Sequence, residues 1–489
     1  MNFSHFTDTT IVNLRQFKNK GDFKMKFSKK QLLGLILSAI VIIGMNFVPT
    51  TELLTTAGRN TIGILIVMLL MFVTEGLPLP ITCLVLPALL VLFGCVPIKD
   101  AYSGFANHLM FFVLASFGIS TAITKVNLSR RMLIALMNAF GGSVKMLLFA
   151  MMVCGALVSS MVSNIATASA FIPLVIDFLN LYPNEADRKK TGCAFMIGIT
   201  VANMIGGMMT PAGSSLNLLI MAQLETLTGI SVTFAQWMAF GLPISVVFVP
   251  LSWWIVVKLN PVVEVSKVDI DSYLESVEKP GKWSQKEKLV VILIAIMFVL
   301  WILSSWVPFL QVTVVTTIIV CLMMVPQVGI FSWDEYKQNV SWEAYFMLGS
   351  VMCIGNALVS TQASNWFAEA LIPANLDLSH TLILMLVGLL IFVLLIPVPV
   401  APALIGMLSA PLVALAANTG ISPVVMMMVL GLCVSNCYLL PLDPVPLLTY
   451  LTGYYKMGQL TRTAIPHQLI LCVLTAVWLP IAAKLLGIL

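Results

Sequence analysis

Polar side chains gather in residues 159–169, between two long apolar stretches of the chain. Ser159, Ser163, Asn164 and Thr167 contribute hydroxyl and amide groups that carry no formal charge. Such neutral oxygens and donors suit a dehydrated monovalent cation or the oxygens of an anion. The alternative is that small hydroxyl residues merely allow membrane helices to pack closely. The pattern therefore indicates a binding site or a close helix contact.

A second polar stretch contains Pro211, Gly213 and Ser214 and interrupts the apolar run 191–221. Proline removes a backbone donor and glycine weakens a helix, so two half-helices joined by unwound chain are expected. The half-helix that follows such a break has free amides and the positive end of its dipole at its start. Both attract anions.

The run 423–453 is broken in the same way by Pro441, Pro444 and Pro446, and it carries Asp443 among them. An acidic residue at membrane depth is costly, which predicts a functional role. The alternative is that Asp443 caps the half-helix that starts at Pro444. The two interpretations are compatible.

The elements that position these groups must lie in a membrane. Of the 489 residues, 59% are hydrophobic and only 10% are charged, whereas soluble proteins carry roughly 25% charged residues. The apolar runs are too long and too continuous for a β-barrel, and they accommodate about 10 to 14 helical spans or half-spans. The nine cysteines show no C-x-x-C pair, and three of the four histidines, including His467, lie near predicted span ends. We expect an all-α polytopic membrane protein without a metal cluster.

The order of segments divides the chain into two similar halves. The predicted parts are a cytoplasmic N-terminal tail at 1–30 (with Met1 or Met25 as the start), a first half at 31–259 with a hairpin at 145–180 and a broken helix at 191–221, a cytoplasmic linker at 260–287, and a second half at 288–489 with a hairpin at 380–417 and a broken helix at 423–453. Each hairpin is either re-entrant or a pair of full spans.

Basic residues test this topology, because lysine and arginine stay on the cytoplasmic side. With the N-terminus inside and the C-terminus outside, 23 of the 26 basic residues are cytoplasmic, and only Arg59, Lys99 and Lys484 lie outside. The second half then starts from the opposite face, which makes the halves inverted repeats. Inverted repeats with paired broken helices indicate a secondary transporter that binds its substrate near the bilayer midplane.

The motifs resemble those of a known family. Ser163-Asn164-Ile165-Ala166-Thr167, with Pro173 after it, resembles the hairpin signature of the divalent anion/sodium symporter family, and residues 210–217 resemble its broken-helix motif. The resemblance implies a dimeric elevator-type carrier of dicarboxylates, tricarboxylates or sulfate. A scaffold would hold a mobile domain that contains the hairpins and the broken helices.

The resemblance also implies the site. A first sodium ion would be bound by Ser159, Ser163, Asn164 and Gly213, and the substrate-binding residues would be Ser163, Asn164, Ile165, Gly213, Ser214, Pro402, Asp443 and Pro444. Ile165 stands where the family usually has threonine. Ala401-Pro402-Ala403 occupies the position of the second Ser-Asn-Thr, so the side-chain ligands of a second sodium ion are missing, and Asp443 becomes the candidate coupling residue.

The sequence thus predicts a secondary active transporter of small organic dianions in the cytoplasmic membrane. Sodium symport, proton symport and exchange remain open as coupling modes. The expected partners are the dianion, membrane lipid and a second copy of the chain, with no nucleic acid and no cofactor besides sodium. The alternatives are a sulfate-like inorganic anion carrier of related fold and an integral membrane enzyme. The chain carries no H-E-x-x-H, G-x-S-x-G or P-loop pattern, so we expect no enzyme.

Overall fold

The computed structural model describes residues 28–488 apart from 52–53, 127, 141, 267–268, 271, 274–280, 305, 308, 365, 367–377, 397 and 399. Every regular element in this part of the chain is a helix. The predicted tail therefore lies outside the described residues up to position 27, as do parts of the predicted linker.

The first half contains eleven described α-helices and two short 3-10 helices. They are α2 (Lys29–Met45), α3 (Thr56–Thr74), α4 (Leu79–Leu92), α5 (Ile98–Ala101), η1 (Ser103–Ala106), α6 (His108–Lys125), α7 (Leu128–Phe140), α8 (Val144–Ser159), α9 (Asn164–Leu179), α10 (Glu185–Gly207), η2 (Pro211–Gly213), α11 (Ser215–Thr228) and α12 (Phe234–Leu259).

The second half follows the same order of elements. Its described helices are α14 (Gln285–Leu303), α15 (Val312–Met324), α16 (Trp333–Asn339), α17 (Trp342–Ser360), α19 (His380–Leu394), α20 (Ala401–Thr419), α21 (Pro423–Val434), α22 (Pro444–Leu451) and α23 (Met457–Leu485). Among the described helices, α3, α6, α12, α17, α20 and α23 are long and apolar enough to cross a membrane.

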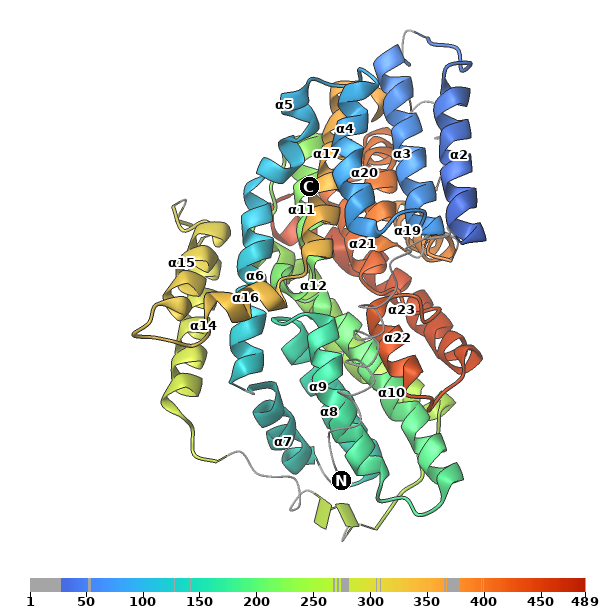
Figure 1. The fold of residues 1–489 in the computed structure, drawn as a ribbon. Coiled ribbons are helices and arrows are strands. Elements are labelled where there is room, and N and C mark those ends of the chain that lie inside the picture. Colours follow the sequence, from blue (N-terminus) through green and yellow to red (C-terminus); the bar gives the residue numbers. More distant parts are fainter. Residues whose placement is uncertain are drawn as a thin grey trace, which may run out of the picture.

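Helix packing shows the internal repeat. The hairpin helices α8 and α9 pack on α10, and their counterparts α19 and α20 pack on α21. The halves also interlock, since α11 packs on α20 and the equivalent α22 packs on α9. In Figure 1, α10 lies below α11 whereas α21 lies above α22, so the second half is inverted relative to the first. The predicted inverted-repeat fold with two hairpins and two broken helices is confirmed.

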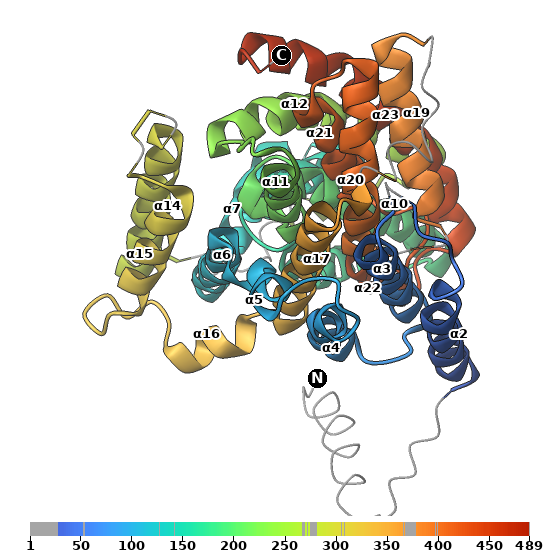
Figure 2. The same cartoon turned by 90° about the horizontal axis from the view of Figure 1, so that it is seen from above.

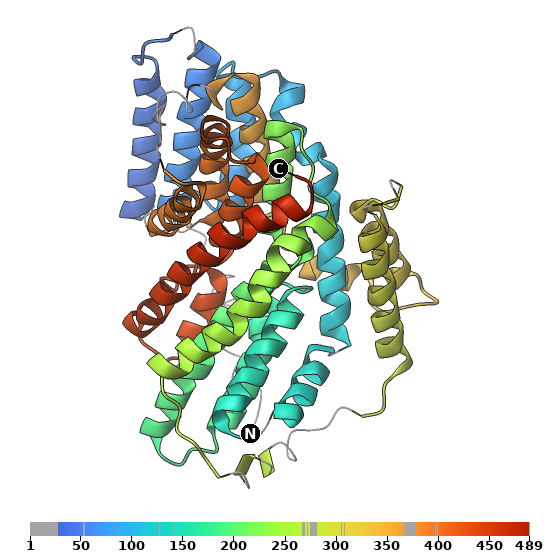
Figure 3. The same ribbon diagram turned by 180° about the vertical axis from the view of Figure 1, so that it is seen from behind.

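The closing helices of the two halves form the back of the molecule. Figure 3 shows α12 and α23 running side by side across this face, and they pack on each other. Seen from above, α14 and α15 stand at one edge and α2 at another, while α11, α17 and α20 lie near the centre (Figure 2). Of the hairpin and broken-helix elements, α11 and α20 thus lie nearest the centre, whereas α19 lies at the periphery.

The first break is positioned by close helix packing. A side chain at Gly206 would place its Cβ 2.2 Å from the carbonyl oxygen of Ala156, so only glycine permits this contact between α10 and α8. The helix α10 ends one residue later, and α11 begins after Ser214, whose hydroxyl accepts a hydrogen bond from Leu216 N. The chain from 208 to 214 is therefore held between two helix ends.

Ion pairs and hydrogen bonds tie the elements together at the end where the predicted linker lies. Arg131 of α7 contacts Glu287 of α14 at 2.6 Å, and Lys125 of α6 contacts Glu335 of α16 at 2.5 Å. The Glu264 carboxylate accepts a hydrogen bond from Val144 N, at the start of α8. The first part of the linker thus folds back onto the first hairpin.

Candidate functional site

Three oxygen atoms converge at the tip of the first hairpin. The Ser159 hydroxyl at the end of α8 lies within hydrogen-bonding distance of Asn164 Oδ1 and 2.5 Å from the backbone oxygen of Asn203. A hydroxyl has one hydrogen and can donate it to only one of these acceptors. Ser159 is fully buried and Asn164 half-buried. A buried group of oxygens with too few hydrogens fits a small cation.

Two glycines bring the first broken helix onto this tip. A Cβ at Gly207 would lie 2.7 Å from both Oδ1 and Nδ2 of Asn164, and a Cβ at Gly213 would lie 2.7 Å from the Gly207 oxygen. Gly207 therefore lies close against the side chain of Asn164, and Gly213 lies close against Gly207. Of the predicted sodium ligands, Ser159, Asn164 and Gly213 are brought together in this way.

The unwound chain of the first break is held by hydrogen bonds from its own polar residues. Thr210 donates through Oγ1 to the Ser160 oxygen at 2.6 Å and accepts from Gly213 N at 3.2 Å. Asn217 donates to the Gly207 and Thr210 oxygens at 2.7 and 2.8 Å. These bonds satisfy backbone groups that a membrane would otherwise leave unpaired.

The remaining predicted residues of the first half occupy helix starts. Ser163 is the N-cap of α9 without a capping bond from its hydroxyl, and Ser214 is the N-cap of α11. Both are half-buried. The side chain of Ile165 is 44% exposed, so an apolar group lies accessible beside the polar tip.

The predicted residues of the second half lie at the starts of two other helices. Pro402 is buried in the first turn of α20, and Pro444 is exposed in the first turn of α22. Asp443 caps α22, because its Oδ1 accepts a hydrogen bond from Val445 N at 3.2 Å. The capping role considered for Asp443 is thus present. Within the described residues, none of the three is hydrogen-bonded to the first hairpin tip.

Sequence reasoning missed Asn203 of α10. With its amide assigned to match its neighbours, Asn203 donates to the Gly155 oxygen and accepts from Ala168 N. It therefore joins both hairpin helices to α10, and its own backbone oxygen faces Ser159. The available signal was an asparagine within the apolar part of this helix, residues 192–207.

Sequence reasoning also missed Ser435 and Asn436, which follow α21. Ser435 donates to Oδ1 of Asn217 at 3.1 Å, and Asn436 donates to the Leu432 oxygen at 2.9 Å. Asn436 Nδ2 also lies 3.2 Å from the sulfur of Met208, in the first break. The signal was again polar residues in an apolar run, here the same Ser-Asn pair as at the first tip.

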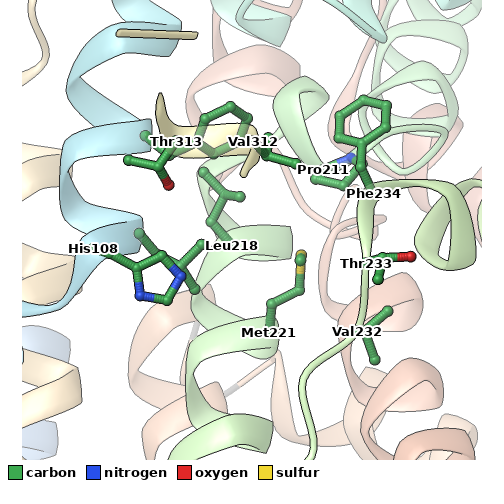
Figure 4. A pocket seen from close by; sticks show the side chains of 11 residues that line it. His108, Pro211, Leu218, Met221, Val232, Thr233, Phe234, Val312 and Thr313 are labelled. Carbon is green, nitrogen blue, oxygen red and sulfur yellow. The ribbon is translucent and has the colours of Figure 1, made fainter. Parts of the chain in front are cut away.

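A separate cavity of about 100 Å³ lies between α6, α11 and the starts of α12 and α15. Figure 4 shows His108, Leu218, Met221 and Phe234 around it, with Pro211 at one side. Pro211 is the one residue of the broken-helix motif that lines it, and the lining is mainly apolar. This cavity is therefore distinct from the polar site at the hairpin tip.

Comparison with known proteins agrees with this architecture. The family model "sodium:sulfate symporter transmembrane region" matches residues 29–489. An uncharacterized transporter of Haemophilus influenzae is 23% identical over 95% of this chain and 97% of its own length. The sodium-dependent dicarboxylate transporter SdcS of Staphylococcus saprophyticus is 24% identical over 88% of this chain and 86% of its own length.

A solved structure shares the fold. The crystal structure of the YdaH transporter of Alcanivorax borkumensis matches with a TM-score of 0.59 at 16% identity, over 94% of this chain and 98% of that one. The all-α membrane fold and the family resemblance predicted from the sequence are both confirmed. Because the family model spans nearly all the described residues, this integral membrane protein belongs to the sodium:sulfate symporter family.

Proposed function

We propose that the protein is a secondary active carrier of small organic dianions, with C4-dicarboxylates as the substrate class, and that one sodium ion moves with each dianion. The observation that carries this proposal is the convergence of the Ser159, Asn164 and Asn203 oxygens at the first hairpin tip. A sodium ion there would be coordinated by lone pairs of these oxygens, while the Ser159 hydroxyl keeps its hydrogen. Ser163 precedes Asn164 in the chain, and Gly213 lies against Gly207, which lies against Asn164. Membership of the family and the sodium dependence of the relative SdcS support this assignment.

The dianion would be held by neutral groups. The starts of α9 and α11 present free backbone amides at Ser163 and Ser214, and helix N-termini favour negative charge. No lysine or arginine is among the fully buried residues of the described chain, and we propose that the co-transported cation supplies the compensating charge. This arrangement makes anion binding depend on sodium, which is the basis of symport.

An organic dianion is favoured over sulfate by Ile165. Its exposed apolar side chain lies next to Asn164, where a hydroxyl would suit a fourth anion oxygen better. An apolar surface beside two polar helix starts matches a short carbon skeleton with carboxylates. Sulfate has no apolar part to place there.

We further propose a homodimeric elevator in the cytoplasmic membrane, with the N-terminus inside. The moving unit would contain the hairpins and broken helices, α8–α12 and α19–α23, and the other helices would form the scaffold. Support comes from the packing of α11 on α20 and of α22 on α9, which ties both sets of site elements into one body.

The test is uptake of labelled succinate into proteoliposomes, with sodium, pH and internal substrate varied independently and sulfate as competitor. Asn164→Ala should lower apparent sodium affinity about 5- to 150-fold, because losing one partner of a desolvated ion costs about 1–3 kcal/mol. Ser169→Ala is the matched control, since Ser169 is exposed on the same helix. Wild-type sodium dependence in Asn164→Ala would refute the cation site. Uptake of sulfate without succinate would refute the substrate class.

A further inference from the structure

A histidine lies buried where α23 packs on α12. His467 is fully buried about ten residues into α23, so the sequence-based prediction that it lies near a span end is wrong. Its ring makes edge contacts with Phe248 of α12 and with Tyr438 of the second break, at centroid distances of 6.0 and 6.1 Å. The imidazole is thus enclosed by three elements.

The hydrogen bonding around this ring is incomplete. His467 Nδ1 lies 2.6 Å from the Thr463 oxygen, whereas Nε2 has no partner among the described residues. The hydroxyls of Ser252 in α12 and of Tyr438 are also buried without a partner in the described chain. Buried polar atoms in native proteins are nearly always paired. His467 Nε2 and the Tyr438 hydroxyl belong to rings that are in contact, and Ser252 of α12 lies next to the imidazole, so these atoms are candidates for binding a polar group.

The acid–base chemistry of the imidazole indicates that the species bound here is a proton. A carbonyl can only accept, so Nδ1 must carry the hydrogen, and a neutral imidazole then leaves Nε2 with a lone pair. The backbone of Ser252 also faces the ring. When Nε2 takes up one proton, the ring gains a second N–H donor, which can face the backbone of Ser252. Histidine is the side chain whose ordinary titration lies nearest neutral pH.

Few other ionisable groups surround the ring. Tyr438 is the titratable residue in ring contact, and no charged side chain acts on the imidazole. Cys433 of α21 and Cys472 of α23 face each other instead. On α12, the Lys258 ammonium sits over the Trp254 ring, and α19 carries only His380, exposed at its start. A proton at Nε2 would therefore be the one charge at this place.

Polar groups connect His467 to the second break and to the end of α12. Thr461 donates to the Leu439 oxygen at 2.9 Å, which fixes the unwound chain next to Tyr438. In the other direction, Asn260 at the end of α12 donates to the hydroxyl of Thr463 at 2.9 Å. The site therefore lies between the linker end of the molecule and the broken helix of the second half.

We propose that His467, together with Ser252 and Tyr438, forms a proton-binding site that couples a proton to movement of the second broken helix. Nε2 takes one proton from water on one side of the membrane and returns it to water on the other, with no other bond made or broken. The second half offers no side-chain oxygen at Ala401-Pro402-Ala403, and a proton on His467 would be a cation within that half of the chain. Proton binding stands by itself, whereas its coupling to a dianion rests on the proposed function.

Proton binding is tested on the purified full-length protein with ¹⁵N-labelled histidine, by following imidazole resonances from about pH 4 to about pH 9. His467→Gln assigns the signal, and His380→Gln is the matched control because His380 is exposed. We expect the His467 signal to titrate, with a midpoint that shifts in Tyr438→Phe. A His467 signal that stays in one protonation state across this range would overturn the proposal.

Coupling is tested in proteoliposomes that contain a pH-sensitive dye, with a sodium gradient and external succinate. We expect about one proton to enter with each dianion in the wild type and almost none in His467→Gln, with sodium-dependent exchange retained. Tyr438→Phe removes only the unpaired hydroxyl and should shift the pH dependence of uptake. This second variant tests the site even if the histidine variant misfolds.

An unchanged proton-to-dianion ratio in His467→Gln would overturn the coupling. Absence of any dianion transport would instead refute the proposed function and leave the resonance titration decisive for the site.

Discussion

Ser435 donates a hydrogen bond to Asn217 Oδ1 across 3.1 Å, and this bond joins the two broken helices. The same asparagine donates through Nδ2 to the Gly207 and Thr210 oxygens of the first break. Asn217 and Ser435 are both buried, with exposed fractions of 0% and 2%. One side chain thus stabilises the unwound chain of the first half and ties it to the second.

Replacing Asn217 should therefore affect both stability and transport. Asn217→Ala leaves the Gly207 oxygen without its side-chain donor, at about 1–3 kcal/mol, and removes one of the two hydrogen bonds to the Thr210 oxygen, which still accepts from Gly213 N. Ser435→Ala removes one ordinary hydrogen bond worth about 1 kcal/mol. Thermal unfolding in detergent and succinate uptake measure the two effects. Ser409→Ala is the control, because Ser409 is equally buried but bonds only to Ile405 in its own helix. Equal losses in all three variants would contradict the link between the breaks.

Adding one methyl group beside Asn164 should disturb the sodium site. The Cβ of Gly207→Ala would lie 2.7 Å from the Asn164 amide, so that side chain must turn away from Ser159. We expect the sodium concentration for half-maximal uptake to rise at least tenfold, about 1.4 kcal/mol. Gly458→Ala has open space around its new Cβ and should behave as wild type. Unchanged sodium dependence in Gly207→Ala would mean that cation binding does not involve Asn164.

Asp443 is predicted to combine a capping and a coupling role. Asparagine caps helices as well as aspartate does, so Asp443→Asn should keep the bond to Val445 N and the stability, while Asp443→Ala should lose about 0.5–2 kcal/mol. If the carboxylate takes part in coupling, Asp443→Asn reduces gradient-driven accumulation far more than counterflow exchange. Both are measured in the same proteoliposomes. Wild-type accumulation in Asp443→Asn would show that Asp443 only caps α22 and takes no part in coupling.

The orientation predicted from the basic residues can be checked by labelling in intact cells. Ser272→Cys, in the linker, should be protected from a membrane-impermeant thiol reagent, and Lys484→Cys, at the end of α23, should react. The background is Cys321→Ser, because Cys321 is exposed and the other eight cysteines are buried. Labelling of Ser272→Cys with protection of Lys484→Cys would reverse the topology.

The ion pair between Lys125 and Glu335 should make the stability of the fold decrease as the pH becomes acidic. Its hydrogen bond, with help from the Ser332 backbone, lowers the pKa of Glu335 to about 2. A folded pKa below the unfolded value of about 4.3 stabilises the protein above that value, and the stabilisation disappears as pH falls toward the folded pKa. The wild-type melting temperature should therefore fall more steeply than that of Glu335→Gln between about pH 5 and about pH 2. Parallel curves would show that the exposed pair contributes nothing.

Much of the fold could be predicted from the sequence because its causes are local. Apolar runs bounded by basic residues give membrane helices and their orientation. Glycine and proline break α10 from α11 and α21 from α22 through their own backbone chemistry. Helix caps such as Ser214 and Asp443 act within two residues of themselves. Each of these features depends on neighbours in the chain.

Only the tertiary structure decided which polar atoms meet. Asn203 faces Ser159 across 44 positions of sequence, Asn217 meets Ser435 across 218, and His467 lies against Ser252 and Tyr438 on other elements. An apolar run does not state which of its faces is buried or against what, because helices in lipid are apolar all round. The sequence therefore determined the kind of protein and its breaks. The packing of α8 on α10 and of α12 on α23 decided where a cation and a proton could be bound.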